Sequence, residues 1–495
     1  MTGKIAVVGA GPGGLTAAML LAHRGYSVKV FEKADRVGGR SASITDGDYV
    51  FDTGPTFLMM TFVLREMFEA VGRDLEDYCR IVHLDPMYRL NFREVSFDPS
   101  RDNEVTRQRI AEKFPGQEEG FDRFLERESV RYRYMYPCLQ VPYGSLLSMA
   151  SPQLLRALPH LSAGRSLYSV LGDYFDDPNL RISFTFQAKY LGMSPWSCPG
   201  LYAMIPYIEH FFGIEHVEGG LSNISEAMAS VIEEEGGEMM LSTPVSGIVT
   251  DGRRMASGVE LADGTREEFD AVVVNADFGY AATELFEPGL VRKWSPDRLQ
   301  RANYSCSTFM LYLGLDTTYD EPHHQIILAD DYQRNINEIM GEEVLSEDVS
   351  VYVRNATVTD GTLAPEGHTA LYVLVPVPNT RAPIEWSPDL VRSFRARVMD
   401  RIARRTSMKD LEDHIVYEKV LTPPDWRDEY SILHGATFNL GHNIMQMLYF
   451  RPHNRFEDVG RCYIVGGGTH PGSGLPTIYE SARISANLIG EDLPL

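Results

Sequence analysis

Residues 4–40 read KIAVVGAGPGGLTAAMLLAHRGYSVKVFEKADRVGGR, and this stretch decides the fold. Residues 5–8 form a short apolar run that is typical of a buried parallel strand. A helical pattern follows, and a second apolar run over residues 27–31 ends at Glu32. Between the first run and the helix, three glycines take the spacing G-x-G-x-x-G: Gly9, Gly11 and Gly14. This order of elements predicts a Rossmann-like α/β unit that binds a dinucleotide.

Each glycine of this motif has a physical role. Gly9 permits the tight turn, Gly11 lets the backbone approach a pyrophosphate, and Gly14 lets the helix pack closely on the strand. The N-terminus of the helix adds free N–H groups and the positive end of its dipole. Glu32 follows at the distance where a carboxylate accepts hydrogen bonds from a ribose, which favours FAD or NAD over NADP. The motif alone leaves FAD and NAD open.

The bulk composition excludes several classes of protein. A chain of 495 residues exceeds one compact core, so we expect two or three folding units. The formal charge of −23 argues against a nucleic-acid partner, which would need clustered Lys and Arg. No run of 18 apolar residues occurs, and the first strand starts too early for a signal peptide to precede it. The cysteines are scattered, without a C-x-x-C pair, as in a reducing cytosol without metal or disulfide frameworks: Cys79, Cys138, Cys198, Cys306 and Cys462.

A second glycine turn follows Glu32 and carries a family resemblance. Its backbone could approach a ribityl or pyrophosphate group, and Arg40 could pair with a phosphate. The pattern Glu-x5-Gly-Gly-Arg after the dinucleotide motif resembles the flavin amine oxidase and carotenoid desaturase superfamily, whose members bind FAD. Residues 51–56, FDTGPT, resemble an element of bacterial phytoene-desaturase-type enzymes that lies beside the flavin. The resemblance implies cofactor contacts from Lys33, Gly39, Arg40, Gly54, Pro55 and Thr56.

The C-terminal part of the chain carries the second half of the resemblance. Residues 466–476 read GGGTHPGSGLP, between a buried strand over residues 462–465 and a helix over residues 477–489. The run closely resembles carotenoid desaturases, in whose superfamily the dipole of this helix faces the flavin ring and favours its anionic reduced form. The implied cofactor contacts from the middle and the end of the chain are Val245, Gly467, Gly468, Gly474, Leu475 and Pro476.

Residues 129–172 differ from the rest of this acidic chain because they contain no Asp or Glu. Short amphipathic helices with arginines and exposed leucines can lie in a membrane interface, although a buried cap over the core or a subunit interface is the alternative. With the reducing-type cysteines, this predicts a cytoplasmic protein attached peripherally to the inner face of the cell membrane. The aromatic residues between 184 and 212 would line an apolar tunnel or simply form core. The arginines of the acid-free window are Arg131, Arg133, Arg156 and Arg165.

These patterns predict an α/β fold with a discontinuous Rossmann-like FAD-binding domain over residues 1–95, 215–290 and 456–495. A helical, membrane-associating and channel-forming region would occupy residues 96–214. A mixed α+β substrate domain would occupy residues 291–455. We expect no metal site, because the adjacent pair His323 and His324 would point to opposite faces of a strand.

The resemblance covers Lys4 to Gly490 and implies a phytoene-desaturase-type FAD enzyme. In the implied reaction, a linear polyisoprenoid of the phytoene or diapophytoene class loses a hydride to flavin N5 and a proton from the neighbouring carbon. Oxygen or a membrane quinone would be the final electron acceptor. Arg451 could clamp a flavin phosphate or pair with an acid, and His442 and Gln446 would share one helix face. The candidates for the base are His216, Glu218, His442 and His470.

Other functions remain open at this point. The same family includes carotenoid isomerases, retinol saturases and terminal-methyl oxidases, which only the products can distinguish. A non-catalytic prenyl-lipid carrier would share the fold without using a flavin, but the intact phosphate motif argues against it. An amine or porphyrinogen oxidase is a further alternative, against which the acid-free window and the loop over residues 466–476 both argue.

Overall fold

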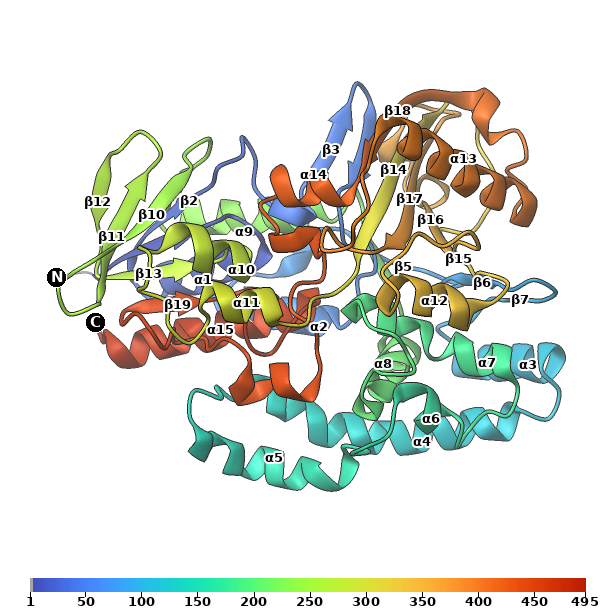
Figure 1. Ribbon diagram of the computed structural model, residues 1–495, viewed down its shortest axis with the longest axis horizontal. Helices are drawn as coiled ribbons and strands as arrows, with labels where there is room; N and C mark the ends of the chain where they lie inside the picture. The colour runs from blue at the N-terminus through green and yellow to red at the C-terminus, as the bar shows by residue number, and fades with distance from the viewer. Residues whose placement is uncertain (1–2) are drawn as a thin grey trace.

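The computed structural model describes residues 3–495, apart from the side chain of Tyr190. Figure 1 shows a sheet with both chain termini on one side of the molecule, a larger sheet on the other side, and a layer of helices below them. The C-terminus is tied to the start of the chain, because the Tyr26 hydroxyl donates to the Leu493 carbonyl at 2.6 Å.

The first sheet is parallel throughout and has the strand order β19-β13-β1-β2-β9. Its central strands are apolar, as is typical of parallel strands that helices cover. Helix α1 (Pro12–His23) packs against both α9 (Ser222–Glu234) and α15 (Leu475–Asp492). Since segments from three parts of the chain meet in one parallel sheet, the predicted Rossmann-like α/β unit is confirmed. The strands are β1 (Lys4–Val8), β2 (Ser27–Phe31), β9 (Glu238–Met240), β13 (Ala271–Val274) and β19 (Cys462–Ile464).

A three-stranded antiparallel sheet packs beside β13 and contains the hairpin that the Asp263-Gly264 pair predicts from the sequence. It consists of β10 (Val245–Thr250), β11 (Ala256–Leu261) and β12 (Arg266–Glu268). Gly264 has a φ of +83° at the turn, which explains the Asp-Gly signal in the sequence.

The second large sheet has seven strands in the order β18-β14-β17-β16-β15-β6-β7. Its neighbours are antiparallel except for β15 and β6. Helix α13 (Pro388–Arg405) supplies apolar residues to the core on one face. Strands β6 and β7 come from the range predicted for the FAD-binding domain, and the division into three domains stays a prediction. The strands are β6 (Arg89–Asn91), β7 (Ser96–Phe97), β14 (Ser307–Leu315), β15 (His324–Ile327), β16 (Val351–Asn355), β17 (Thr369–Val377) and β18 (Ile415–Leu421).

Apart from the 18-residue helix Glu118–Met135, the layer below is built from shorter helices, around an aromatic core that includes Phe121, Phe124, Phe175 and Phe184. Among the helices of residues 3–495, none combines the length and the apolar character that a bilayer crossing requires. The helices are α3 (Asn103–Lys113), α4 (Glu118–Met135), α5 (Pro152–Ala157), α6 (Leu167–Leu171), α7 (Pro178–Ser183) and α8 (Met204–Phe212).

The remaining elements connect these layers. The sequence of residues 216–220 predicts the start of a helix that runs to about residue 235, but this start is wrong. His216 belongs to β8 (Glu215–Val217), which pairs with β5 (Ile81–His83), and the helix starts at Ser222. The positive φ angles of Gly219 and Gly220 form the turn between β8 and that helix. The other elements are β3 (Ser43–Asp46), β4 (Tyr49–Asp52), α2 (Thr61–Glu69), α10 (Phe278–Tyr280), α11 (Pro296–Arg301), α12 (Tyr332–Met340) and α14 (Pro423–Asp428).

Candidate functional site

The first glycine loop lies at the carboxyl end of β1 and is packed too tightly for side chains. A Cβ atom on Gly14 would lie 2.2 Å from the Gly9 carbonyl oxygen, and Gly9 itself has a φ of +99°. Helix α1 starts directly after Gly11, which has no side chain to cap it. Its first N–H groups therefore face outward as donors for an anion, as the dinucleotide motif requires.

Glu32 is buried at the carboxyl end of β2, where its carboxylate is held on both oxygens. Oε2 accepts from the Ala10 N–H at 2.7 Å and Oε1 accepts from the Ala34 N–H at 2.9 Å. Each oxygen keeps a further lone pair for a ribose hydroxyl. The Glu32 carbonyl also accepts from the Thr243 N–H at 2.8 Å, which brings the start of β10, and with it Val245, next to β2. The Lys33 ammonium is engaged within the protein, since it donates to the Glu429 carbonyl at 2.8 Å.

The second glycine turn is joined directly to the first. The Gly38 N–H donates to the Ala10 carbonyl at 2.8 Å, and a Cβ on Gly39 would lie 3.5 Å from Gly11 Cα. The Arg40 guanidinium donates to the Thr437 carbonyl at 2.9 Å. Burial lowers the pKa of Arg40.

Arg40 and Asp277 are connected through one amide. In the orientation that satisfies its neighbours, the Asn439 amide donates to Asp277 and accepts from Arg40. Burial raises the pKa of Asp277, and the charge of Arg40 opposes that shift. Arg40 is therefore held by side chains of two distant segments beside the glycine turns.

The FDTGPT element is held by hydroxyl groups of the seven-stranded sheet. Tyr312 donates to the Thr53 carbonyl at 2.5 Å, and Tyr372 donates to the Gly54 carbonyl at 2.7 Å. Thr56 Oγ1 lies 2.8 Å from the Tyr352 hydroxyl. Pro55 therefore sits between two anchored residues. The element is tied to the seven-stranded sheet and also touches the second glycine turn, since a Cβ on Gly54 would lie 2.7 Å from the Arg40 carbonyl oxygen.

The C-terminal glycine loop meets the first one. A Cβ on Gly13 would lie 3.2 Å from the backbone nitrogen of Gly466, so loops from opposite ends of the sequence are in contact. Gly467 and Gly468 are as restricted as the first loop: a Cβ on Gly468 would lie 2.5 Å from Phe278 Cβ. Helix α15 starts at Leu475, followed by Pro476, after the uncapped Gly474. Two helix N-termini therefore border one region, which suits a ligand with several phosphate or ring oxygens.

Arg451 fixes the C-terminal loop and corrects a prediction. It is completely buried, and its donors reach backbone carbonyls, not an acid or a phosphate. Burial lowers its pKa to about 10. The partners are the carbonyls of Gly467 at 2.6 Å, Thr469 at 2.9 Å, Gln446 at 3.0 Å, and Leu440 and Gly441 at 3.3 Å.

Two candidate bases lie in this C-terminal region. His442 Nε2 accepts from the Ser473 N–H at 3.0 Å, and burial lowers the pKa of His442 well below its usual range. His442 and Gln446 do not share a helix face, because only a short 3-10 turn, Ile444–Gln446, forms there. Burial lowers the pKa of His470 to about 3, and its ring packs edge-on against Tyr143.

The other two candidate bases have partners of their own. Arg354 lies 3.0 Å from Nδ1 of His216, and Asp360 lies 2.9 Å from Nε2. Since a guanidinium only donates, Nδ1 accepts and Nε2 donates, so both nitrogens of His216 are engaged. Glu218 forms an ion pair at 2.9 Å with Arg80, which is largely exposed.

Arg354, which connects His216 to Asp52 and His323, was not identified from the sequence. Arg354 on β16 forms a buried ion pair of 2.7 Å with Asp52, and its Nε donates to His323 at 3.2 Å. The fragment VYVRN around Arg354 indicated a strand, and an arginine within such an apolar run was the signal for a buried ion pair.

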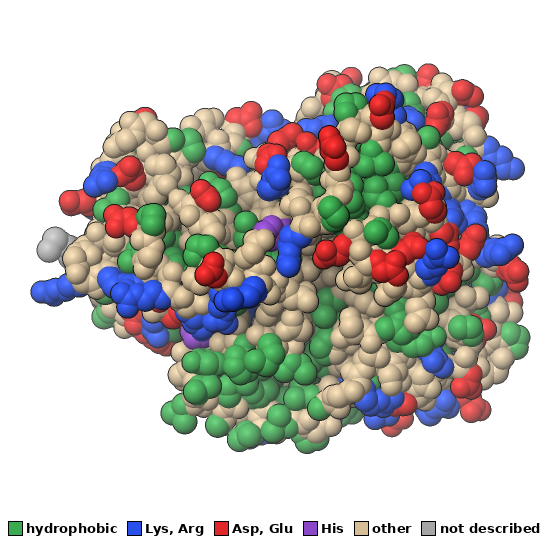
Figure 2. Space-filling view, viewed as in Figure 1, with side chains coloured by type: hydrophobic (Ala, Val, Ile, Leu, Met, Phe, Trp, Pro, Cys, Tyr) green, Lys and Arg blue, Asp and Glu red, His purple; other side chains and the backbone are tan. Residues whose placement is uncertain are grey.

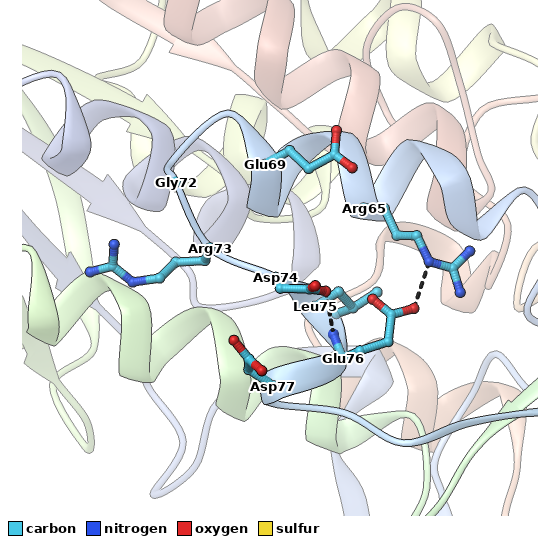
Figure 3. A pocket seen from close by; sticks show the side chains of 8 residues that line it. All are labelled: Arg65, Glu69, Gly72, Arg73, Asp74, Leu75, Glu76 and Asp77. Atoms are coloured by element: carbon cyan, nitrogen blue, oxygen red, sulfur yellow. Dashed lines mark hydrogen bonds and ion pairs between the residues drawn. The ribbon is translucent and has the colours of Figure 1, made fainter.

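Neither of two surface hollows among the described residues resembles a polyene channel. The first has a volume of about 460 Å³ and is lined by residues of α2 and the following turn (Figure 3), including the Arg65–Glu76 pair at 2.7 Å. The second, of about 220 Å³, lies beside β7 and α3. Both linings carry charged residues, so the tunnel stays a prediction. Within residues 3–495, no group of three or more His, Cys, Asp or Glu residues could hold a metal ion.

Comparisons with known proteins give a consistent picture. The family model described as flavin containing amine oxidoreductase matches residues 12–490. The chain is 48% identical over 490 residues to the 4,4'-diapophytoene desaturase (4,4'-diapolycopene-forming) of Methylomonas sp, covering 99% of this chain and 96% of the relative. It is 38% identical to the all-trans-zeta-carotene desaturase of Myxococcus xanthus, with 98% and 93% covered.

Solved structures agree on the fold alone. Putrescine oxidase bound to putrescine matches with a TM-score of 0.66 at 17% identity, covering 100% of both chains. The Rab GDI of Plasmodium falciparum matches with a TM-score of 0.52 at 11% identity, covering 100% of this chain and 98% of that one. An oxidase and a Rab GDI thus share this architecture, so the fold alone does not assign a reaction. Only the relatives with higher sequence identity give information on the chemistry.

Proposed function

Because the chain belongs to the flavin-containing amine oxidoreductase family and its full-length relatives are carotenoid desaturases, we propose that it desaturates 4,4'-diapophytoene with FAD as its cofactor. The observation that carries this proposal is the 48% identity to the Methylomonas enzyme, which extends over both glycine loops and everything between them. The identity is 34–38% to the desaturases whose names give zeta-carotene or phytoene and 32% to the 4,4'-diapophytoene desaturase of Staphylococcus aureus, so the choice of substrate rests on the Methylomonas relative alone.

The residues present fit an FAD molecule. The N–H groups at the start of α1 would bind the pyrophosphate, and the remaining lone pairs of Glu32 would bind a ribose. The start of α15 offers a second positive helix end for the flavin ring. When bound, FAD supplies the acceptor for a hydride. The chain itself must orient the polyene, exclude water and take up the proton.

The finer proposal of membrane attachment is supported by an exposed apolar patch. Leu147 is 84% exposed and Leu146 is 67% exposed, and the turn that carries them packs against the turn after Ile444 and Met445, which are 64% and 65% exposed. Figure 2 shows apolar side chains gathered over α5, with Lys and Arg side chains along the border of the patch. Such a surface fits the interface of an anionic bilayer.

The arginines of the acid-free window contribute unequally. Arg131 pairs with buried Glu128 at 2.6 Å, and Arg165 pairs with Asp173 at 2.7 Å at the surface, so both charges are compensated by carboxylates of the protein. Arg133 and Arg156 are exposed and available for lipid headgroups. The electrostatic attraction to the bilayer is therefore weaker than the sequence suggests, and the apolar patch supplies most of the affinity.

The reaction is tested by expression in a host that makes 4,4'-diapophytoene, and in a second host that makes phytoene. Chromatography should show polyenes with additional double bonds, formed in higher yield from 4,4'-diapophytoene, and the purified protein should absorb as a flavoprotein. An isomer with unchanged hydrogen count, an oxygenated product, or a colourless protein that only binds the polyene would each contradict the proposal. Anaerobic assays with and without a quinone distinguish the two electron acceptors.

Membrane attachment is tested by sedimentation with anionic liposomes. Placing Asp at both Leu146 and Leu147 removes about 2–4 kcal/mol of apolar transfer, which corresponds to roughly a 100-fold weaker partition. Val416→Asp is the matched control, since Val416 is 56% exposed on β18, away from the patch. Equal sedimentation of all three proteins would contradict the role of the patch.

A further inference from the structure

His323 directly precedes β15 and His324 opens it, and the two rings pack edge-on at 4.4 Å between ring centres, so the prediction that they point to opposite faces of a strand is wrong. The polar contacts of the two rings nevertheless differ. His323 has both nitrogens engaged, because Nε2 accepts from Arg354 and Nδ1 lies 3.0 Å from the Thr359 hydroxyl. His324 is 0% exposed, and its Nδ1 lies 2.7 Å from the Tyr352 hydroxyl. Among the atoms that the structure describes in residues 3–495, Nε2 of His324 has no hydrogen-bond partner. A buried imidazole nitrogen without a partner is costly, so it calls for an explanation.

The position of His324 links it to the proposed cofactor element. Tyr352 bridges His324 to Thr56 of the FDTGPT element, with 2.8 Å between the two hydroxyl groups. The His324 ring stacks on Phe57, the residue that directly follows that element, at 4.3 Å between ring centres. The imidazole is therefore linked by hydrogen bonds through Tyr352, and by stacking on Phe57, to the segment that the family resemblance places beside the flavin.

The surroundings of this imidazole suit a polyene. The Phe57 ring lies 6.2 Å from Tyr88, and Tyr88 lies 5.3 Å from Phe186, the first residue of the turn Phe186–Leu191. This row of aromatic rings runs from the FDTGPT element into the stretch predicted as a channel lining. Flat conjugated chains pack well against aromatic faces.

We propose, building on the proposed desaturase function, that His324 is the catalytic base, whose Nε2 accepts the proton lost by the polyene. FAD, when bound, would supply the acceptor for a hydride, which would leave one carbon with the electron pair of its C–H bond. The C–H bond on the neighbouring carbon would then break: its electron pair would form the new double bond, and its proton would bind Nε2 of His324. The imidazolium would return this proton to solvent when the product leaves.

The row of hydroxyl groups prepares the imidazole for this task. When Nδ1–H donates to the Tyr352 oxygen, the Tyr352 hydroxyl can donate to Thr56, and Nε2 keeps a free lone pair. Burial, then the charges of Arg354 and His216, lower the pKa of His324 well below its usual range, so the ring is neutral before reaction. A weak base is sufficient, because a C–H bond next to an allylic cation is strongly acidic.

The first experiment measures the tautomer, not the activity. Nitrogen-15 NMR of histidine-labelled, FAD-loaded protein should show His324 neutral, with a proton on Nδ1 and none on Nε2, between pH 6 and pH 9. The signal is assigned by its loss in His324→Gln. In Tyr352→Phe, which keeps the packing but removes the acceptor, the same signal should shift toward the other tautomer. A proton on Nε2, or an imidazolium, in the wild-type protein would overturn the proposal.

The second experiment is anaerobic single-turnover reduction of the bound flavin by the polyene. We expect His324→Gln to slow it about 100-fold or more, with the FAD content unchanged, and His323→Gln to remain within a few-fold of wild type. Equal rates for wild type and His324→Gln would refute the role of His324 while the desaturase function stands. A wild-type flavin that no polyene reduces would refute the desaturase function itself.

Discussion

Replacing Arg451 by methionine should weaken the C-terminal half of the flavin site. The two shortest bonds of its guanidinium, to the carbonyls of Gly467 and Thr469, are charge-assisted and buried. Bonds of this kind contribute about 1.5–3 kcal/mol each, so we expect Arg451→Met to lower the free energy of unfolding by about 3–5 kcal/mol. Arg451→Lys should recover less than half of this, because one ammonium cannot span carbonyls of two segments.

The assay combines urea unfolding of the FAD-loaded protein, followed by circular dichroism, with the fluorescence of released flavin. Arg455→Met is the matched control: Arg455 lies close in sequence and pairs with Asp492 at 2.7 Å on the surface, where the loss should stay below about 1 kcal/mol. The reasoning requires flavin release to precede global unfolding in Arg451→Met. A variant with the wild-type midpoint and full flavin content would refute it.

The remaining predictions concern three other features. Gly14→Ala should yield protein without FAD, because the added Cβ collides with the carbonyl at the start of the loop; Gly361→Ala, where the described residues leave nothing within 4 Å, should keep its flavin absorbance. Arg354→Met should cost about 3–5 kcal/mol by leaving Asp52 buried without its cation, and adding Asp52→Asn should restore part of this in denaturant titrations. Burial lowers the pKa of Lys189 to about 7. The unfolded chain therefore binds one more proton between pH 7 and pH 10, so stability should rise with pH over this range and rise less in Lys189→Met.

Local signals in the sequence were sufficient to predict most of the fold. The backbone geometry of the first glycine loop requires Gly9, Gly11 and Gly14, so a few residues are sufficient to predict it. Strand β1, helix α1 and strand β2 appear as predicted. Strand β18 was missed, because only its last residue, Leu421, is buried and because the charged residues Glu418 and Lys419 interrupt its apolar pattern. Its place at the sheet edge depends on pairing with β14, about a hundred positions earlier.

The site could be predicted only in part, for the same reason. The family resemblance indicated both glycine loops, but the network of Asp52, His216 and Arg354 joins residues that no local pattern connects. The prediction for His442 and Gln446 failed because a spacing of four shares a face only within a helix. In this segment the carbonyls of Gly441 and Gln446 accept from Arg451 and so are not available to a regular helix.

The contact between the two glycine loops has a consequence for synthesis in the cell. Strand β1 leaves the ribosome first, whereas β19 and α15, which complete the same sheet, leave it last. Until β19 and α15 have been synthesised, the nascent chain therefore carries half of a nucleotide cleft and an unpaired side of β13. Cofactor loading must then wait until these last elements of the sheet have left the ribosome. A shortage of flavin or of chaperones should reduce the yield of this protein more than that of an enzyme whose cleft is completed by one early stretch of chain.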